Sequence, residues 1–240
     1  MIRLIGSVFV YNGEALQTHA FENYSPLGGL KVVSSIFNQH CVDEIFISTR
    51  RNSNEKGPSE YVLKTLYDLN LSTPIIYSGG IETISDVRLC LESGVDRVGL
   101  NSSLFHMSRV KEIINYIGIQ GVVAIIPFAS IKGSFFAFNC KTRRFDMTVK
   151  KIIDMLPDKV EISLIDMASD GESHGFSKNI LNNINGRRLI LQGGVIGDID
   201  KIEENEGSNK ISGISIENKL FWSECATQNF RNKMQCFIDR

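Results

Sequence analysis

The sequence has little cysteine, almost no net charge and no long apolar run, and each shortage excludes a class of protein. A net charge of −1 over 240 residues excludes general affinity for nucleic acid. No apolar stretch approaches the roughly 18 residues of a membrane span, and no secretory leader is recognisable, so we expect a cytoplasmic protein without membrane contacts. The five cysteines contain no CxxC pair and no metal-type spacing, which predicts reduced thiols, no metal centre and no cofactor bound through them. They are Cys41, Cys90, Cys140, Cys225 and Cys236.

Short apolar, β-branched runs alternate with amphipathic stretches along the whole chain. The predicted strands are Leu4–Val10, Glu44–Ser48, Pro74–Tyr77, Arg97–Leu100, Val122–Ile126, Val160–Ile165, Arg188–Gln192 and Gly213–Ile216. Each gap has room for one crossover helix, and nearly continuous apolar runs indicate a sheet covered on both faces. Eight such units predict a single parallel (β/α)₈ TIM barrel spanning 1–240. A doubly wound open sheet is the alternative.

The sequence contains an internal two-fold repeat, in which motifs of the first half recur in the second, and this favours the barrel. Gly79-Gly80 follow the third predicted strand and Gly193-Gly194 follow the seventh; Asn101-Ser102 and Glu217-Asn218 follow the fourth and eighth. Glycine lets the backbone approach an anion closely, with its N–H groups directed at the anion. Gly79, Gly80, Asn101 and Ser102 are therefore predicted to bind one phosphate, and Gly193 and Gly194 half of another. Tight turns alone are the alternative explanation.

Five segments in order carry a family resemblance: IRLIGSVFVYNGEALQTHAFEN, YSGGI, GVDRVGLNSS, EISLIDMASDGESHGF and LQGGV. Together they resemble the cyclase subunit of imidazole glycerol phosphate synthase, over about residues 2–222. This resemblance implies a barrel that receives ammonia from a glutaminase partner.

The chain departs from this family at the positions of the family's catalytic and phosphate-binding residues. The family's two catalytic aspartates, on strands one and five, align with Phe9 and Ile126, which cannot transfer protons. A family lysine aligns with Gln17, and Glu217-Asn218 replace small residues at the second phosphate site, where a carboxylate opposes a phosphate. We therefore expect no catalytic residue at the usual positions and a compromised second phosphate site.

The opposite end of the barrel retains what the resemblance implies is an ammonia gate. Its four aligned residues, Arg3, Glu44, Arg97 and Glu161, alternate in sign, so they can pair at a mouth that would otherwise bury single charges. An ordinary solvated rim is the alternative. Asp96 resembles the acid with which the family docks its glutaminase, although an exposed turn residue explains it equally well.

A gate without the acid–base pair favours an ammonia-channelling subunit over a cyclase. The sequence is most similar to paralogues from surface-polysaccharide gene sets, which implies a glutaminase at the N-terminal face. It also implies a sugar amidotransferase at the C-terminal face that amidates an acetylated amino sugar. Ammonia is expected to leave beside Phe9 and Ile126.

Three rival functions remain open. The first is a true cyclase using Asp166 or Asp170, the latter also a possible ligand contact; the others are a scaffold that activates the glutaminase and an aminoaldose isomerase. His174 is a weaker catalytic candidate, and Arg50-Arg51 and Lys141–Arg144 are weaker anion-binding or partner-binding candidates.

Overall fold

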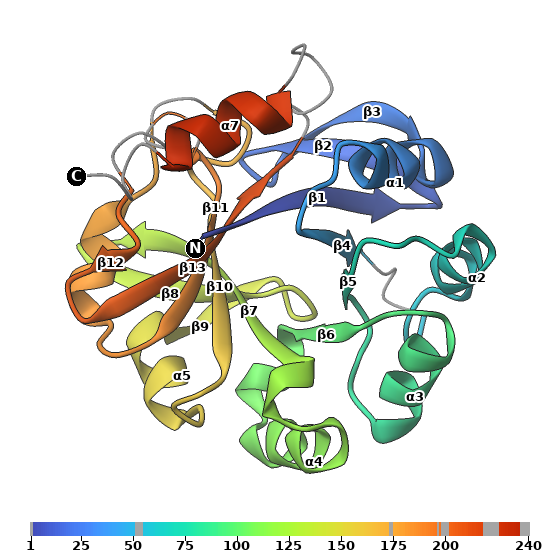
Figure 1. Cartoon of the computed structure of the whole chain (residues 1–240). Helices are drawn as coiled ribbons and strands as arrows, with labels where there is room; N and C mark the ends of the chain where they lie inside the picture. The colour runs from blue at the N-terminus through green and yellow to red at the C-terminus, as the bar shows by residue number, and fades with distance from the viewer. Residues whose placement is uncertain are drawn as a thin grey trace.

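The computed structural model describes residues 2–50, 55–172, 175–195, 197, 202–217 and 226–235. Eight parallel strands form a closed barrel, because the last of them pairs with the first. In barrel order they are β1 (Arg3–Tyr11), β4 (Glu44–Thr49), β5 (Ile75–Ser78), β6 (Arg97–Leu100), β7 (Val122–Ile131), β10 (Glu161–Asp166), β11 (Arg188–Gln192) and β13 (Asn209–Ile216). All eight predicted strands and the TIM-barrel fold are confirmed (Figure 1).

Helices surround the barrel, and their apolar faces pack on the outward-facing strand residues (Figure 1). They are α1 (Leu30–Gln39), α2 (Glu60–Leu69), α3 (Ile84–Glu92), α4 (Met107–Ile117), α5 (Val149–Met155) and α7 (Ala226–Gln235). The short 3₁₀ segments are η1 (Ser102–Phe105), η2 (Ile119–Gly121) and η3 (Lys178–Asn183). The helix α3 begins with a reciprocal capping box between Thr83 and Asp86, which satisfies otherwise unpaired N–H groups. No helix within the described residues has the length and apolar character needed to cross a bilayer.

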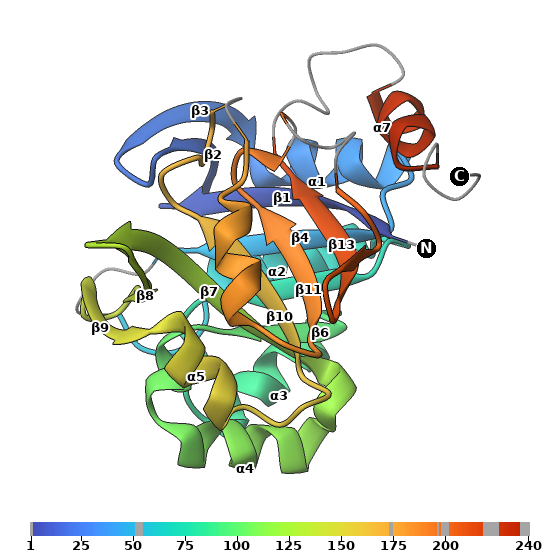
Figure 2. The same cartoon turned by 90° about the vertical axis from the view of Figure 1, so that its left-hand side faces the viewer.

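Two antiparallel hairpins extend the barrel at its C-terminal end, one from each half. β2 (Glu14–His19) and β3 (Asn23–Gly29) continue β1, and β8 (Ser134–Asn139) and β9 (Arg144–Thr148) continue β7. Figure 2 shows both projecting from the end opposite the N-terminus. The second hairpin carries the aromatic residues Phe135, Phe136 and Phe138 on β8. The first was not predicted, and it lies on the candidate site. A further short strand, β12 (Asn205–Glu206), pairs with β13.

Side chains fill the barrel interior in layers, as the alternation of strand residues requires. The inward-facing positions form a second apolar cluster, separate from the one between the strands and the helices. It comprises Ile5, Phe46, Ile76, Val123, Ile125, Ile165 and Ile190. The barrel axis is therefore packed, with polar layers at its two ends.

Candidate functional site

Four charged side chains meet at the N-terminal mouth. Arg3, Glu44, Arg97 and Glu161 begin β1, β4, β6 and β10, so their contacts cross the barrel. Arg3 lies 2.6 Å from both Glu44 and Glu161, and Arg97 lies 3.2 Å from Glu44 and 2.8 Å from Glu161. The pairs close into a ring, named here the charge ring, in which each acid lies between two bases.

The charge ring is largely shielded from water. Glu44 and Glu161 are each 5% exposed. Burial by itself raises the pKa of Glu161, but the charges of Arg97 and Arg3 and the hydroxyl of Ser212 outweigh it and lower that pKa to about 2. Removing either arginine of the ring would therefore leave its two buried carboxylates sharing the one that remains.

Above the charge ring, the interior is closed but not wholly apolar. The side chains of the apolar cluster, with Ser163 and Ser215, line a space too narrow to hold a water-sized molecule. The buried hydroxyls of Ser7, Ser163 and Ser215 have no hydrogen-bond partner among the described residues. A small molecule crossing the barrel would have to displace side chains, and it would meet unsatisfied hydroxyls on the way.

At the C-terminal mouth, two carboxyl groups lie against each other. Asp170 follows β10 and Glu217 follows β13, and their side chains hydrogen-bond to one another. Thr18 Oγ1 donates to Asp170 Oδ2 at 2.5 Å, and Gln192 Nε2 donates to Glu217 Oε1 at 3.2 Å. Asp170 is only 1% exposed. The sequence indicated each acid separately; their pairing, and the roles of Thr18 and Gln192, were missed.

This carboxyl pair is arranged to share a proton. Burial raises the pKa of Asp170 to about 6, against hydrogen bonds that favour its ionised form. Burial and then the neighbouring Asp170 charge raise the pKa of Glu217 well above its ordinary range. Two carboxyl groups in contact titrate as a pair, because both cannot readily be ionised. Near neutral pH the pair can therefore both donate and accept a proton.

The β2–β3 hairpin covers the mouth and is fastened to Asp170. The N–H of Ala20 donates to the Asp170 carbonyl at 2.9 Å, and the N–H of Phe21 donates to its carboxylate. Phe21 packs against the interior apolar cluster. Nearby, Phe9 stacks on Tyr24 with ring centroids 5.6 Å apart.

The structure separates the two positions aligned with the family's catalytic aspartates. Phe9 lies at the C-terminal end of β1, under the hairpin. Ile126 instead packs in the cluster between strands and helices, whereas Ile125 faces the interior. The expected exit beside Ile126 is therefore wrong, because a strand residue one position out of phase points to the opposite face.

Both glycine pairs are required by packing between neighbouring loops. A Cβ on Gly80 (φ +73°) would lie 1.9 Å from the Gly57 carbonyl oxygen, and one on Gly79 would lie 2.0 Å from Thr49 Oγ1. In the second half, a Cβ on Gly193 would lie 2.4 Å from the carbonyl oxygen of Asp166. These contacts explain the glycines without an anion, which favours the tight-turn alternative.

We expect Gly80→Ala to destabilise the chain by more than about 2 kcal/mol, because it combines a positive φ with a collision against backbone. Gly94→Ala is the matched control: its φ is +84° at the αL end of α3, yet nothing lies within 4 Å of the added Cβ. Its cost should stay near 1 kcal/mol. Urea unfolding of both variants makes the comparison, and equal losses would show that packing does not require Gly80.

Asn101 is already committed to structure. Its Nδ2 donates to the carbonyls of Ile125 and Phe138 at 3.1 and 3.0 Å, and its Oδ1 accepts from the N–H of Cys140 at 2.8 Å. The amide thus fastens the second hairpin to the barrel instead of facing an anion. Ser102 begins η1 after β6, and Gly79 and Gly80 follow the neighbouring strand β5. Phosphate binding at this end remains a prediction, carried by backbone N–H groups alone.

Other predicted residues hold loops together. The carboxylate of Asp96 accepts from the N–H of Ile75 at 2.8 Å, at the N-terminal face. Asp166 accepts from the N–H groups of Ala168 and Ser177 and from the Ser169 hydroxyl, so it organises the loop that carries Asp170.

Arg51, His174 and Asn218 lie outside the described residues. Within the described part of the chain, no group of three or more His, Cys, Asp or Glu side chains could hold a metal ion.

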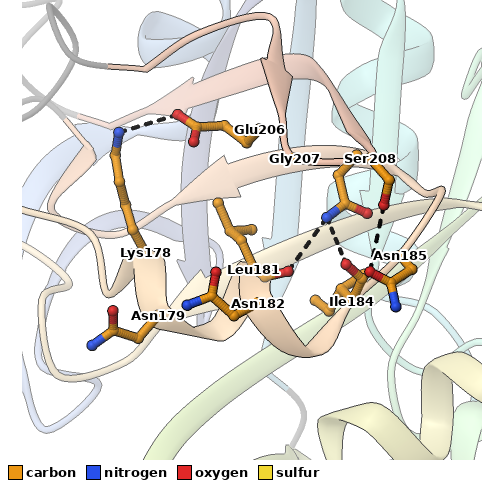
Figure 3. Close-up of a pocket in the computed structure, with 10 residues that line it drawn as sticks. Lys178, Asn179, Leu181, Asn182, Ile184, Asn185, Glu206, Gly207 and Ser208 are labelled. Carbon is orange, nitrogen blue, oxygen red and sulfur yellow. Dashed lines mark hydrogen bonds and ion pairs between the residues drawn. The ribbon is translucent and has the colours of Figure 1, made fainter.

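A separate polar cleft of about 360 Å³ lies on the outside of the barrel, between η3 and the β12–β13 turn (Figure 3). Lys178 pairs with Glu206 at 3.1 Å, and Asn209 donates to the carbonyls of Leu181 and Ile184 at 3.4 and 2.7 Å. These contacts join the cleft's own walls. None of the residues that line this cleft belongs to the charge ring or lines the narrow interior space.

Comparison with known proteins shows the family. The model of the family described as histidine biosynthesis protein matches residues 3–222. The Lactococcus lactis imidazole glycerol phosphate synthase subunit HisF is 29% identical over 187 residues, covering 75% of this chain and 72% of its own. A Campylobacter jejuni protein provisionally named imidazole glycerol phosphate synthase subunit hisF2 is 24% identical over 226 residues, with 89% and 88% covered. The chain belongs to the histidine biosynthesis protein family, and it resembles the cyclase subunit of imidazole glycerol phosphate synthase, hisF2-type proteins included.

Proposed function

We propose that the chain is an ammonia-conducting subunit that works with a glutaminase in the cytoplasm and delivers ammonia for amidation of an acetylated amino sugar in polysaccharide biosynthesis. The charge ring is the observation that carries this function. Four paired charges at one end of a barrel axis form a barrier that opens only if its ion pairs rearrange. Neither Phe9 nor Ile126 can replace the acids that cyclisation uses.

The two ends of the barrel suggest where partners bind. A glutaminase at the N-terminal face, beside Asp96, would release ammonia directly at the charge ring. At the other end the β2–β3 hairpin closes the mouth through Phe21, so a sugar amidotransferase docked there would displace it. The relatives are named as subunits of a synthase, which agrees with a chain that acts in a complex.

The test is nitrogen transfer in a reconstituted complex. We expect the chain, reconstituted with a partner glutaminase and a sugar amidotransferase, to pass amide ¹⁵N from glutamine into the sugar even when the solution holds excess unlabelled ammonium. Labelling diluted to the level of the bulk ammonium would contradict channelling and would leave a scaffold that only activates the glutaminase.

One observation favours a second function. The Asp170–Glu217 pair supplies a proton donor and acceptor at the C-terminal mouth, as a cyclase with relocated acids requires. We expect the purified chain with ammonium salt to form no imidazole glycerol phosphate from its formimino-ribulose precursor. Product formation that is lost in both Asp170→Asn and Glu217→Gln would instead establish the cyclase.

A further inference from the structure

The C-terminal mouth holds one buried oxygen acceptor that lacks a donor among the described residues. Gln192 donates its Nε2 to Glu217, and its side chain is buried, at 6% exposed. Its Oε1 has no hydrogen-bond partner among the described residues. A buried acceptor left unpaired costs free energy, so such atoms are rare in native structures. Gln192 therefore indicates a hydrogen-bond donor that is to be supplied at this site.

The same place has excess negative character. Among the described residues, neither Asp170 nor Glu217 forms an ion pair with a lysine or arginine, and only His19 on β2 exerts a favourable charge effect on Asp170. A phosphate would be repelled by these carboxyl groups. A small cation that donates hydrogen bonds would be attracted.

We propose that Asp170, Glu217 and Gln192 form a receiving site for ammonium at the C-terminal end of the barrel. Ammonium has four N–H donors and no acceptor, and it can insert between the two carboxyl groups while bonding Gln192 Oε1. The ammonia that reaches this site is taken to come from the glutaminase partner, and in that respect this inference rests on the proposed function.

Unpaired hydroxyls lead from the interior to this site. Ser215 lies on β13, two residues before Glu217 follows that strand, and Ser163 lies on β10, the strand that leads to Asp170. Both hydroxyls line the narrow interior space, and neither has a partner among the described residues. Ammonia can donate to and accept from a hydroxyl, so this side of the barrel offers it hydrogen bonds between the charge ring and the mouth.

Arrival of ammonia changes the protonation of the pair in a balanced step. The nitrogen lone pair forms a new N–H bond with the proton shared by Asp170 and Glu217, and the electrons of the broken O–H bond remain on the carboxylate oxygen. Ammonia is a stronger base than a carboxylate, so the transfer is favourable. The products are ammonium and two carboxylates that surround it. The pair would thus hold the nitrogen until an acceptor takes it.

Thermal unfolding of the isolated full chain tests the site with ammonium chloride as the probe. At constant ionic strength and pH 7.5, replacing KCl by NH₄Cl should raise Tm by about 3 °C once ammonium reaches about ten times its Kd. Glu217→Gln should abolish this rise. Asp154→Asn removes an exposed carboxylate on α5 and should retain it. An equal response to potassium and ammonium, or a rise that survives Glu217→Gln, would overturn the proposal.

A second measurement needs only the wild-type chain, so it does not require any variant to fold. In the wild-type chain, ¹⁵N-labelled ammonium should give a resonance with proton exchange slowed by at least tenfold relative to free ammonium; exchange at the free rate would overturn the site. Ammonium binding without nitrogen transfer from glutamine would refute the proposed function alone. Transfer from glutamine without ammonium binding would refute this inference alone.

Discussion

Replacing Arg97 by methionine should lower the free energy of unfolding by about 3 kcal/mol and uncouple nitrogen transfer from glutamine hydrolysis. Arg97 pairs with both Glu44 and Glu161, whose side chains are 7% and 6% exposed. Methionine keeps the length of the side chain but leaves two carboxylates sharing Arg3. Loss of one partner from a buried ion pair is costly because the remaining charge stays desolvated. Urea unfolding measures the first effect, and ¹⁵N transfer in the complex measures the second.

Arg188→Met is the matched control for that substitution. Arg188 also contacts Glu161, at 3.4 Å, but its side chain is 57% exposed, so the loss should be under about 1 kcal/mol. Nitrogen transfer should continue in this variant. If both variants lose the same stability and both keep transfer, the charge ring is an ordinary solvated rim.

The Asp170–Glu217 pair should make the chain less stable as pH rises from 4 to 8. The pKa of Asp170 is about 6 in the fold against an ordinary 3.8, so the folded chain holds a proton that the unfolded chain has released. Stability from this proton is complete below the ordinary pKa and is lost as pH rises through the folded pKa. Asp170 alone should account for a loss of about 2 kcal/mol over this range, and the raised pKa of Glu217 adds to it with the same sign.

The double variant Asp170→Asn/Glu217→Gln isolates this effect. It keeps the shape of both side chains and removes their titration, so the difference in unfolding free energy between wild type and variant should change by at least about 2 kcal/mol between pH 4 and 8. Taking this difference cancels the pH-dependent contributions to stability that both proteins share, among them the contribution of Glu161. A difference that stays constant with pH would show that the two carboxyl groups do not share a buried proton.

The barrel fold was predictable from the hydrophobic pattern of the sequence. Alternation of apolar runs with amphipathic stretches reports which segments are covered on both faces, and eight such units have few ways to close. The charge ring residues were also identified, but only through the family resemblance, which aligned them with the family's gate. The β2–β3 hairpin was missed because its strands are short and polar, and Glu14–Gly29 has little of the periodicity that marks a buried strand.

The sequence by itself determined the eight strands, the alternating signs of Arg3, Glu44, Arg97 and Glu161, and the lack of acids at Phe9 and Ile126. Only the tertiary structure decided that Ile126 faces the helices and that Asp170 meets Glu217. Strand identity follows from local patterns, whereas contacts between residues 47 positions apart depend on how the barrel closes and how its loops turn inward. Burial, which produces the altered pKa values of the carboxyl pair, exists only once the hairpin covers the mouth.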